Sequence, residues 1–419
     1  MQPPVDTDRL AKAQMTRLIR EDWGRILATL TSSVGNYSLA EDSLQDAVIS
    51  ALQVWPRKGL PDNPAAWMIS VARRKALDRL RRQNTMTRKE DELAHWLEMQ
   101  QGAPDANIAT IPDQRLELIY TCCHPALDQK SRVALTLRAL GGLSTKHIAR
   151  AFVDKPEAMA ARLTRAKKKL STAGIAFKLP DPEDIAPRTD AVLRVIYLIF
   201  NEGAHASNGD LTRGDLVAEA IRLGRILSAL LPDHTETKGL LALMLLSDSR
   251  RFARMDALGN FVPLEAQNRA RWDRAKITEG LNLVEIALSH APAGSYSIQA
   301  AISALHAQAA TFDDTDWPQI VALYDVLQSR IFNPIIAVNQ AVALSYAQAP
   351  QAGLAALDQL MPDAKLEAYQ PYHSCRADLL VRMGQVDAAA QSYRRAIDLS
   401  PSKAQARFLE HRLRALYIG

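Results

Sequence analysis

The sequence predicts an all-α protein in which two small helical domains precede a large array of helices. Apolar side chains recur at helical spacing through most of the chain, and the alternating patterns typical of strands are scarce. Stretches rich in proline and glycine interrupt the helical pattern at a few places. A chain of 419 residues, 47% of them apolar and 23% charged, is long enough for about two or three globular domains.

Positive charge is concentrated in the first half of the chain. Residues 1–184 hold 28 Lys and Arg against 22 Asp and Glu, whereas residues 185–419 hold 23 against 24. Residues 57–89 and residues 138–178 each contain ten basic and two acidic side chains. Two basic islands before a neutral second half predict a polyanion-binding module joined to another domain. The alternative is that both islands are solvated helix faces, although such faces usually mix the two signs.

Helical periodicity first covers residues 8–31 and 39–55. At the start of the second segment, Ser38 is placed to cap the helix and Glu41 to complete a capping box. The stretch PRKGLPDNP, residues 56–64, then breaks the helical pattern.

A helix with two distinct faces is predicted over residues 63–83. Asn63 is a suitable N-cap, and Pro64 fits the first turn, where no backbone N–H is needed. One face is an apolar stripe of Ala65, Ile69, Ala72, Ala76 and Leu80. The other face places Trp67 and Val71 among the basic side chains of Arg74, Lys75, Arg81 and Arg82. Because a solvated face rarely exposes a tryptophan among arginines, this face is predicted to bind something.

A polar tether is predicted over residues 84–112, with an acidic patch at Glu90–Asp91–Glu92. Helical periodicity returns over residues 113–171.

The second basic island, within residues 128–170, has the layout of a helix-turn-helix. After a first helix lined by Val133, Leu137 and Leu140, glycines 141 and 142 turn the chain. Ser144 is expected to cap a short helix that buries Ile148, Ala149 and Phe152. For the last helix, the expected start is a cap at Asp154, Pro156 in the first turn and Glu157 at the capping-box position.

The last helix of this island separates an apolar stripe from a basic face. The stripe consists of Met159, Leu163, Ala166 and Leu170. The opposite face consists of Glu157, Ala158, Ala161, Arg162, Arg165, Lys168 and Lys169. Small residues allow a helix to enter the major groove, while arginine and lysine reach bases and phosphates, so DNA binding is predicted. The alternative is a charged surface hairpin of a helical bundle.

The two islands, in this order and separated by a tether, resemble a bacterial sigma factor of the extracytoplasmic-function group. AEDSLQDAVISALQVW (40–55) is similar to the polymerase-docking helix of that family. AWMISVARRKALDRLRRQ (66–83) resembles its helix for melting and reading the −10 element. LTLRALGGLSTKHIARAFVDKPEAMAARLTRAKKKL (135–170) is similar to its −35-reading helix-turn-helix. The resemblance covers roughly residues 8–175.

The resemblance implies roles for individual residues of the first island. The side chains that would follow the −10 backbone are Arg73, Arg74, Lys75, Arg79, Arg81 and Arg82. Trp67 would stack on or support that surface, with a half-buried packing role as the alternative. The family commonly has asparagine where this chain has Arg74, so direct base selection at that position is not implied. Asp42, Gln45 and Asp46 would face the β′ clamp helices of core RNA polymerase, and the alternative is that they are solvated polar residues.

The second half of the chain begins after KLPDPEDIAP, residues 178–187, the most evident domain boundary. Its last segment, HSCRADLLVRMGQVDAAAQSYRRAIDLSP, is similar to a tetratricopeptide repeat. The matching positions are Ala377, Leu380, Gly384, Ala389, Tyr393, Ala396 and Pro401. Residues 334–361 resemble a degenerate neighbouring repeat, which predicts a stack of helical hairpins; a plain helical bundle is the alternative.

Several blocks of the second half also resemble a subgroup of these sigma factors that carries a long, tetratricopeptide-like C-terminal extension. They include RVIYLIFNEGAHAS (194–207), GLLALMLLSDSRRFAR (239–254) and RARWDRAKITEGLNLVEIAL (269–288). SIQAAISALHA (297–307) and TDWPQIVALYDVL (315–327) are further blocks. This resemblance implies a sigma factor whose regulation is partly built in. Because stacked hairpins present concave surfaces to protein segments, we also expect a protein partner for the C-terminal domain.

Four segments follow from these patterns. Residues 8–84 are expected to form a domain for polymerase docking and −10 recognition, and residues 85–112 a linker. Residues 113–177 are expected to form the −35-reading domain, and residues 188–419 the helical, tetratricopeptide-like regulatory domain.

Other classes of protein are disfavoured by the sequence. No stretch reaches the roughly 18 apolar residues of a membrane span, and MQPPVDTDRL lacks the layout of a signal peptide. Three cysteines, two of them adjacent, indicate a reducing cytoplasm and no disulfide framework. TCCHP (121–125) and NEGAHAS (201–207) lack metal-ligand spacing, and no phosphate loop or nucleophile elbow is present. We therefore expect no catalytic residues, no metal and no cofactor.

The leading hypothesis is a sigma factor that binds core RNA polymerase, through the β′ clamp helices and β, together with promoter DNA. A second hypothesis is a conventional helix-turn-helix regulator with a helical sensor domain. A third is a tetratricopeptide-like adaptor with a basic front half. Residues 40–83 discriminate between them, because a conventional regulator needs no docking helix followed by a cationic and aromatic helix.

Overall fold

The computed structural model describes residues 7–83, 113–152, 154–204, 211–257, 260–289, 292–331, 333–360, 364–400 and 403–417. Within these ranges the regular structure is helical, and the only extended pairing is an isolated antiparallel bridge between Met255 and Phe261. The chain forms two compact units, Met1–Glu202 and Gly203–Gly419. The predicted all-α class is therefore confirmed for the described residues.

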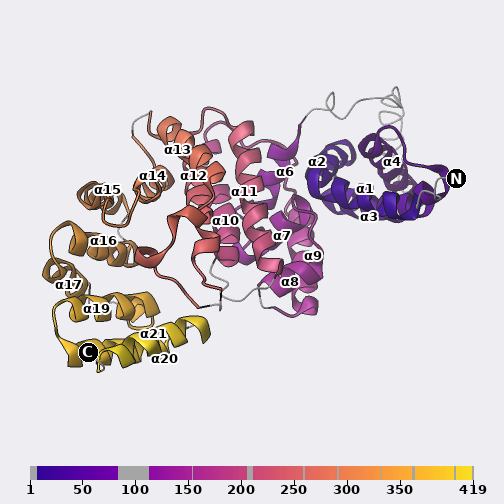
Figure 1. Cartoon of the computed structure of the whole chain (residues 1–419). Coiled ribbons are helices and arrows are strands. Elements are labelled where there is room, and N and C mark those ends of the chain that lie inside the picture. Colours follow the sequence, from indigo (N-terminus) through magenta and orange to yellow (C-terminus); the bar gives the residue numbers. More distant parts are fainter. Residues whose placement is uncertain are drawn as a thin grey trace. The chain divides into compact units, whose positions relative to one another are not determined.

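The first unit begins with four helices, α1 (Thr7–Glu21), α2 (Trp23–Val34), α3 (Tyr37–Lys58) and α4 (Pro64–Gln83) (Figure 1). The periodic segment 8–31 is divided into two helices at Asp22. Helix α3 packs on α1, α2 and α4, and α2 also contacts α1 and α4.

Two of the predicted caps in this bundle have different outcomes. The side chain of Asn63 accepts a hydrogen bond from the N–H of Ala66 at 3.0 Å, so the predicted cap of α4 is confirmed. The predicted capping box of Ser38 and Glu41 is wrong, because Asn36 caps α3 by accepting from the N–H of Leu39 at 3.0 Å. The helix therefore starts earlier than predicted, and it also continues through Pro56 to Lys58.

The second part of this unit contains α6 (Arg115–Cys122), α7 (Gln129–Ala139), α8 (Thr145–Ala151) and α9 (Pro156–Thr172). Ser144 caps α8 as predicted, accepting from the N–H of His147 at 3.2 Å. Asp154 does not cap α9: Lys155 occupies the N-cap position, and Asp154 binds its own neighbour's N–H and the side chain of Arg162. The predicted tether over 84–112, with its acidic patch, lies outside the described residues.

Helix α10 (Ile185–Ala204) is hydrogen-bonded to α6. The hydroxyls of Tyr120 and Thr189 are 2.6 Å apart, and Arg188 donates to the carbonyl of Tyr120 at 2.8 Å. The compact units divide after Glu202, whereas the sequence predicts a domain that starts at residue 188.

The second unit starts with α11 (Leu211–Leu230), α12 (Thr235–Ser249), α13 (Arg274–Leu288) and α14 (Ser295–Gln308). Helix α12 is buried along most of its length and packs against the other three. Its Glu236 carboxylate accepts hydrogen bonds from the N–H groups of Tyr296 and Ser297, each at 2.9 Å. These N–H groups lie in the first turn of α14 and have no partner within the helix.

Helical hairpins complete the second unit. The helices are α15 (Trp317–Arg330), α16 (Pro334–Ala347), α17 (Pro350–Gln359), α18 (Ala364–Glu367), α19 (Gln370–Arg382), α20 (Val386–Asp398) and α21 (Lys403–Ala415). The pairs α16–α17 and α19–α20 pack closely, which is the hairpin arrangement expected for residues 334–361 and for the last segment (Figure 1).

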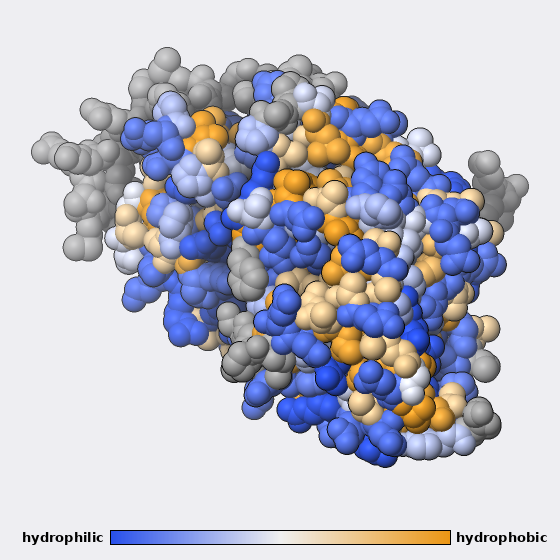
Figure 2. Space-filling view, turned by 90° about the vertical axis from the view of Figure 1, so that its left-hand side faces the viewer, coloured by the Kyte–Doolittle hydropathy of each residue, from blue (hydrophilic) through white to orange (hydrophobic). Residues whose placement is uncertain are grey.

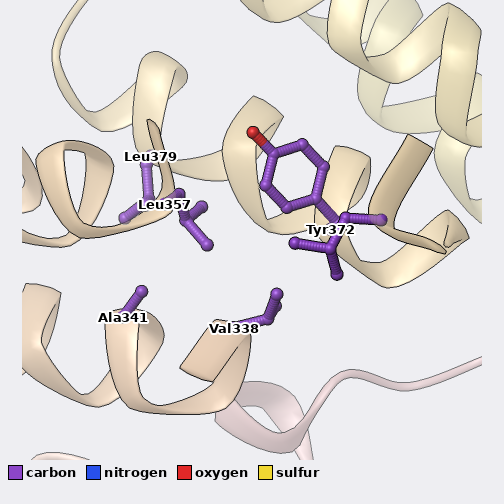
Figure 3. Close-up of a cluster of buried hydrophobic side chains, with 6 residues drawn as sticks. Val338, Ala341, Leu357, Tyr372 and Leu379 are labelled. Carbon is purple, nitrogen blue, oxygen red and sulfur yellow. The ribbon is translucent and has the colours of Figure 1, made fainter. Parts of the chain in front are cut away.

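Buried side chains join the two hairpins. Val338 and Ala341 of α16, Leu357 of α17, and Tyr372 and Leu379 of α19 form one apolar cluster (Figure 3). In the last repeat-like segment, Gly384 lies in the turn between the two helices and has φ +72°, which favours glycine. The apolar residues at the expected repeat positions are buried, namely Ala377, Leu380, Ala389, Tyr393 and Ala396. Pro401 lies outside the described residues.

None of the helices in the described ranges combines the length and the apolarity that a membrane span requires. On the face shown in Figure 2, hydrophobic side chains lie between hydrophilic ones.

Candidate nucleic-acid interface

Helix α4 has the two faces that its sequence predicts. Its inner face buries Ala65, Met68, Ile69, Ala72, Ala76 and Leu77. Leu80, predicted at the end of the stripe, is partly exposed, and Met68 and Leu77 complete the buried face instead. The sequence missed these two because the helix is also covered by α2 and α3, which widens its buried face.

Trp67 is half-buried on α4 and rests on a second tryptophan. Its ring lies edge-on to that of Trp55, with centroids 5.5 Å apart and an interplanar angle of 65°. Trp55 is only 1% exposed, so its ring is held in the core and supports the ring of Trp67. Trp67 is partly exposed, so this geometry is compatible with both the packing role and the stacking role.

The predicted cations of α4 differ in their exposure. Arg74, Arg81 and Arg82 are exposed, and Lys75 is partly exposed. Arg73 is half-buried; burial lowers its pKa, and its Nε has no hydrogen-bond partner within the described part of the chain. A half-buried arginine usually packs its aliphatic stem against the protein and keeps its terminal nitrogens in water.

Arg79 and Asp46, predicted to contact different partners, contact each other. Arg79 Nη2 is 2.7 Å from Asp46 Oδ2, and both side chains are about one-third exposed. An exposed pair of this kind contributes only about 0–1 kcal/mol, so a nucleic acid or a protein surface can replace it at little cost.

The exposed face of α3 continues beyond its predicted polar residues. Asp42 is exposed, and Gln45 is partly buried, donating to Glu41 at 3.2 Å. One and two turns further along the same face, Ile49 and Leu52 are 56% and 40% exposed. Sequence reasoning missed these two residues, although their spacing from Asp42 and Gln45 was the available signal. Exposed aliphatic side chains beside acidic and amide groups are typical of protein-binding surfaces.

Helix α9 presents the predicted basic face to solvent. Met159, Leu163, Ala166 and Leu170 are buried, which confirms the predicted apolar stripe. On the opposite face Glu157, Ala158, Ala161, Arg165, Lys168 and Lys169 are exposed. Arg162 is partly exposed and lies 3.3 Å from Asp154. With α7 and α8 beneath it, α9 has the geometry of a helix that can enter a groove of duplex DNA.

A buried carboxylate attaches this helix-turn-helix to α3. Glu41 is 1% exposed and lies 2.7 Å from Arg138 Nε of α7 and 2.9 Å from Lys167 Nζ of α9. Burial acts to raise the pKa of Glu41, but Lys167 and Arg138 together outweigh it and lower the pKa below its ordinary value. Glu41 is therefore a structural anion at neutral pH rather than part of a capping box, and Lys167 has an internal partner.

Two glycines allow the helix-turn-helix to approach the first bundle closely. Gly142 has φ +63°, and a Cβ there would lie 2.9 Å from Ile19 Cγ2 and 3.2 Å from Trp23 Cγ. A Cβ on Gly24 would lie 3.2 Å from the carbonyl oxygen of Leu140. These contacts and Glu41 fix one face of the helix-turn-helix, while the basic face of α9 remains open.

The cysteines near α6 have no reactive character. Burial raises the pKa of the Cys122 thiol, and raises that of Cys123 to about 11. His124 accepts a hydrogen bond from the N–H of Ala126 at 3.1 Å. In the parts of the chain that the structure describes, no group of three His, Cys, Asp or Glu residues could hold a metal ion.

Comparisons with known proteins assign two segments of the chain. Residues 18–85 match Sigma-70 region 2, and residues 188–288 match a family of unknown function (DUF6596). Over 382 residues the chain is 42% identical to Uncharacterized protein R00370 of Rhizobium meliloti (strain 1021), with 90% of each chain covered. No solved structure matches the chain. The first match spans α2, α3 and α4, which include the predicted docking helix and the first basic face.

Proposed function

The chain belongs to the same family as R00370 of Rhizobium meliloti and contains a sigma-70 region 2, and from this premise we propose that it is a promoter-specificity subunit of RNA polymerase of the extracytoplasmic-function group. A sigma-70 region 2 points to binding of core RNA polymerase and promoter DNA in transcription initiation, without catalysis. The observation that carries the finer proposal is that α4 and α9, within one compact unit, both present basic faces to solvent.

Each face has a distinct task in this proposal. The exposed face of α3, with Asp42, Gln45 and Asp46, docks on the β′ clamp helices. Ile49 and Leu52 add apolar area to that contact.

Helix α4 holds the opened −10 strand. Unstacked bases are held by aromatic and cationic side chains, and the backbone of a single strand by positive charge. Trp67, fixed by Trp55, and the cations of α4 supply both. The DNA-contacting residues proposed on α4 are Trp67, Arg73, Arg74, Lys75, Arg79, Arg81 and Arg82.

Helix α9 reads the −35 element in the major groove. Ala158 and Ala161 are small and exposed, so the backbone of α9 can come close to the bases, while longer cations flank them. The residues proposed to contact this element are Glu157, Ala158, Ala161, Arg162, Arg165, Lys168 and Lys169.

The second unit acts as a built-in regulatory domain in this proposal. Stacked helical hairpins present extended surfaces to protein segments, and the α16–α17 and α19–α20 hairpins share one apolar core, as such stacks require. A protein partner of this unit would thereby influence initiation.

Run-off transcription with purified core polymerase on genomic promoter fragments tests the proposal. Arg162→Ala combined with Arg165→Ala is expected to abolish −35-dependent initiation while core-polymerase binding stays intact. The matched control is Arg20→Ala with Arg194→Ala, which removes the same charge from exposed positions outside α4 and α9 and is expected to initiate normally. Loss of polymerase binding in the α9 variant would refute this division of roles.

The competing function is a conventional helix-turn-helix regulator, which the open face of α9 alone would also serve. It predicts tight, sequence-specific binding of duplex DNA by the protein alone, and no initiation with core polymerase. A sigma subunit instead binds DNA weakly by itself, with an affinity that falls steeply as salt rises.

A further inference from the structure

Several arginines gather in the second unit, around the 3₁₀ turns that follow α12. Arg250 ends α12, Arg251–Ala253 and Arg269–Arg271 form two turns that contact each other, and Arg254 follows the first turn. The electrostatic neighbours of Arg250 are Arg254 and Arg269, which are both cations. His306 of α14 lies close to Arg250 and Arg269.

The buried carboxylate of Asp248, beside the cluster, is already neutralised by other side chains. Asp248, whose side chain is 5% exposed, lies 2.6 Å from Arg251 and 2.9 Å from Lys276. Burial, with Arg254 and Arg269, lowers the pKa of Arg250 to about 9, so Arg250 still carries its charge at pH 7. Arg250, Arg254 and Arg269 are partly exposed, and Asp314 acts on Arg269, so the cluster keeps a surplus of positive charge at a partly open site.

Several donors of this cluster are unused. Among the described residues, no hydrogen bond or ion pair engages the guanidinium of Arg250. Arg269 donates through Nη1 to the carbonyls of His306 and Ala309, at 2.5 and 2.7 Å, but its buried Nη2 has no partner. Nδ1 of His306 and Nε1 of Trp272 are also buried without partners.

Unpaired buried donors of this kind are rare in folded proteins, and each one calls for an ion, a ligand or an ordered water. Arg250 is partly exposed, and a cation that is partly withdrawn from water is stabilised when an anion pairs with it. The planar fork of a guanidinium matches two oxygens of a carboxylate or a phosphate.

We propose that Arg250, Arg269 and His306 form a binding site for a small oxyanion, with Arg250 as its principal contact. Arg269 is held by two backbone carbonyls and by the ring of Trp272, whose centroid is 4.8 Å from its guanidinium carbon, so it is already oriented. His306 adds a neutral ring nitrogen, because burial, with Arg250 and Arg269, lowers its pKa to about 4. The ligand class is a phosphate- or carboxylate-bearing small molecule.

Through this site, a small molecule could bind to the second unit. Arg269 joins the turn before α13 to the end of α14, and Arg250 ends α12. An anion bound between Arg250 and Arg269 would therefore tie the end of α12 to the end of α14. Binding itself does not depend on the proposed function, whereas an effect of the anion on transcription does.

Isothermal titration calorimetry on the full chain, at constant ionic strength, tests the site with inorganic phosphate, citrate and chloride. We expect saturable binding of phosphate or citrate at one site and no binding of chloride. Tighter binding of phosphate would indicate a phosphate-bearing ligand, and tighter binding of citrate a carboxylate-bearing one. Arg250→Gln is expected to weaken binding at least tenfold, and Arg250→Lys less. The matched control is Arg394→Gln, an exposed arginine of the same unit, which is expected to bind as the unchanged protein does.

A second measurement keeps the proposal falsifiable if Arg250→Gln does not fold. The pKa of His306, followed by NMR of histidine-labelled protein, is expected to rise when phosphate or citrate binds, because an anion stabilises the imidazolium. An arginine with a purely structural role would leave it unchanged. Absence of saturable binding, equal binding by Arg250→Gln (an adventitious ion only), or an unmoved His306 pKa would overturn the proposal.

Discussion

At Glu41, one buried carboxylate joins three helices that lie far apart in the sequence. Its partners Arg138 and Lys167 are on α7 and α9, and the distances of 2.7 and 2.9 Å are those of charge-assisted hydrogen bonds. The sequence offered Ser38 and Glu41 as a capping box, a pattern that is local. The actual role of Glu41 depends on residues about a hundred positions away, which no local pattern reveals.

Replacing Glu41 by Gln is expected to lower the free energy of unfolding by about 2 kcal/mol. Removing one partner of a fully buried pair costs about 3–5 kcal/mol, and here the two cations are partly exposed, which reduces the cost. Chemical denaturation of both proteins at pH 7 measures the difference. Glu21→Gln, which breaks the exposed pair with Arg17, is the control and is expected to cost less than about 1 kcal/mol.

The contribution of Glu41 is also expected to depend on pH. Its pKa is lower in the folded chain than the ordinary value of 4.5, so the stabilisation is present above pH 4.5. It is lost as the pH falls through the lowered pKa, because the protonated carboxyl no longer attracts the two cations. Stability measured against pH should therefore show the unchanged protein and Glu41→Gln converging only in acid, and a constant difference down to the lowest pH would contradict the assignment.

At the scale of helices, much of the structure was readable from the sequence. The caps at Asn63 and Ser144 and the buried stripe of α9 depend only on residues within one or two turns. Cap residues and helical periodicity in the sequence therefore predicted them. The failures have physical causes. Asn36, two residues before Ser38, caps α3 instead. Asp154 accepts a hydrogen bond from Arg162 and does not cap the first turn of α9. The exposure of Ile49 and Leu52 depends on which neighbours cover α3.

The turn between α7 and α8 provides a test of how the helix-turn-helix is held. Gly142→Ala is expected to destabilise the protein by about 1–3 kcal/mol, because it adds a strained φ of +63° and a Cβ 2.9 Å from Ile19. Gly174→Ala is the matched control: its φ is +61°, but a Cβ there meets nothing within 4 Å. Thermal denaturation of both variants should show the larger loss for Gly142→Ala, and equal losses would mean that the close packing on α1 does not stabilise the fold.

On the scale of the whole molecule, the position of the unit boundary matters for any truncation. The sequence placed the boundary before residue 188, because three prolines lie there and proline interrupts helices. The compact units divide after Glu202, and Arg188 and Thr189 of α10 bind Tyr120 of α6. The hydrogen bonds between α10 and α6 are long-range side-chain contacts, which composition does not show.

A chain ending at Glu202 is therefore expected to stay folded, whereas one ending at residue 187 should lose stability. If the second unit regulates initiation, the chain ending at Glu202 should bind core polymerase but transcribe at a level different from that of the full chain. Circular dichroism and run-off transcription measure the two effects. Unchanged transcription would mean that the second unit is no built-in regulator.

The most direct test of the central claim is site-specific photocrosslinking in the complex of core polymerase, this protein and promoter DNA. A photoreactive residue at Asp78, exposed on α4, or at Thr164, exposed on α9, reports which DNA lies beside each basic face. We expect Asp78 to crosslink near −10 and Thr164 near −35, and both crosslinks to require polymerase. Crosslinks from both positions to one short duplex site, formed equally well without polymerase, would contradict the account.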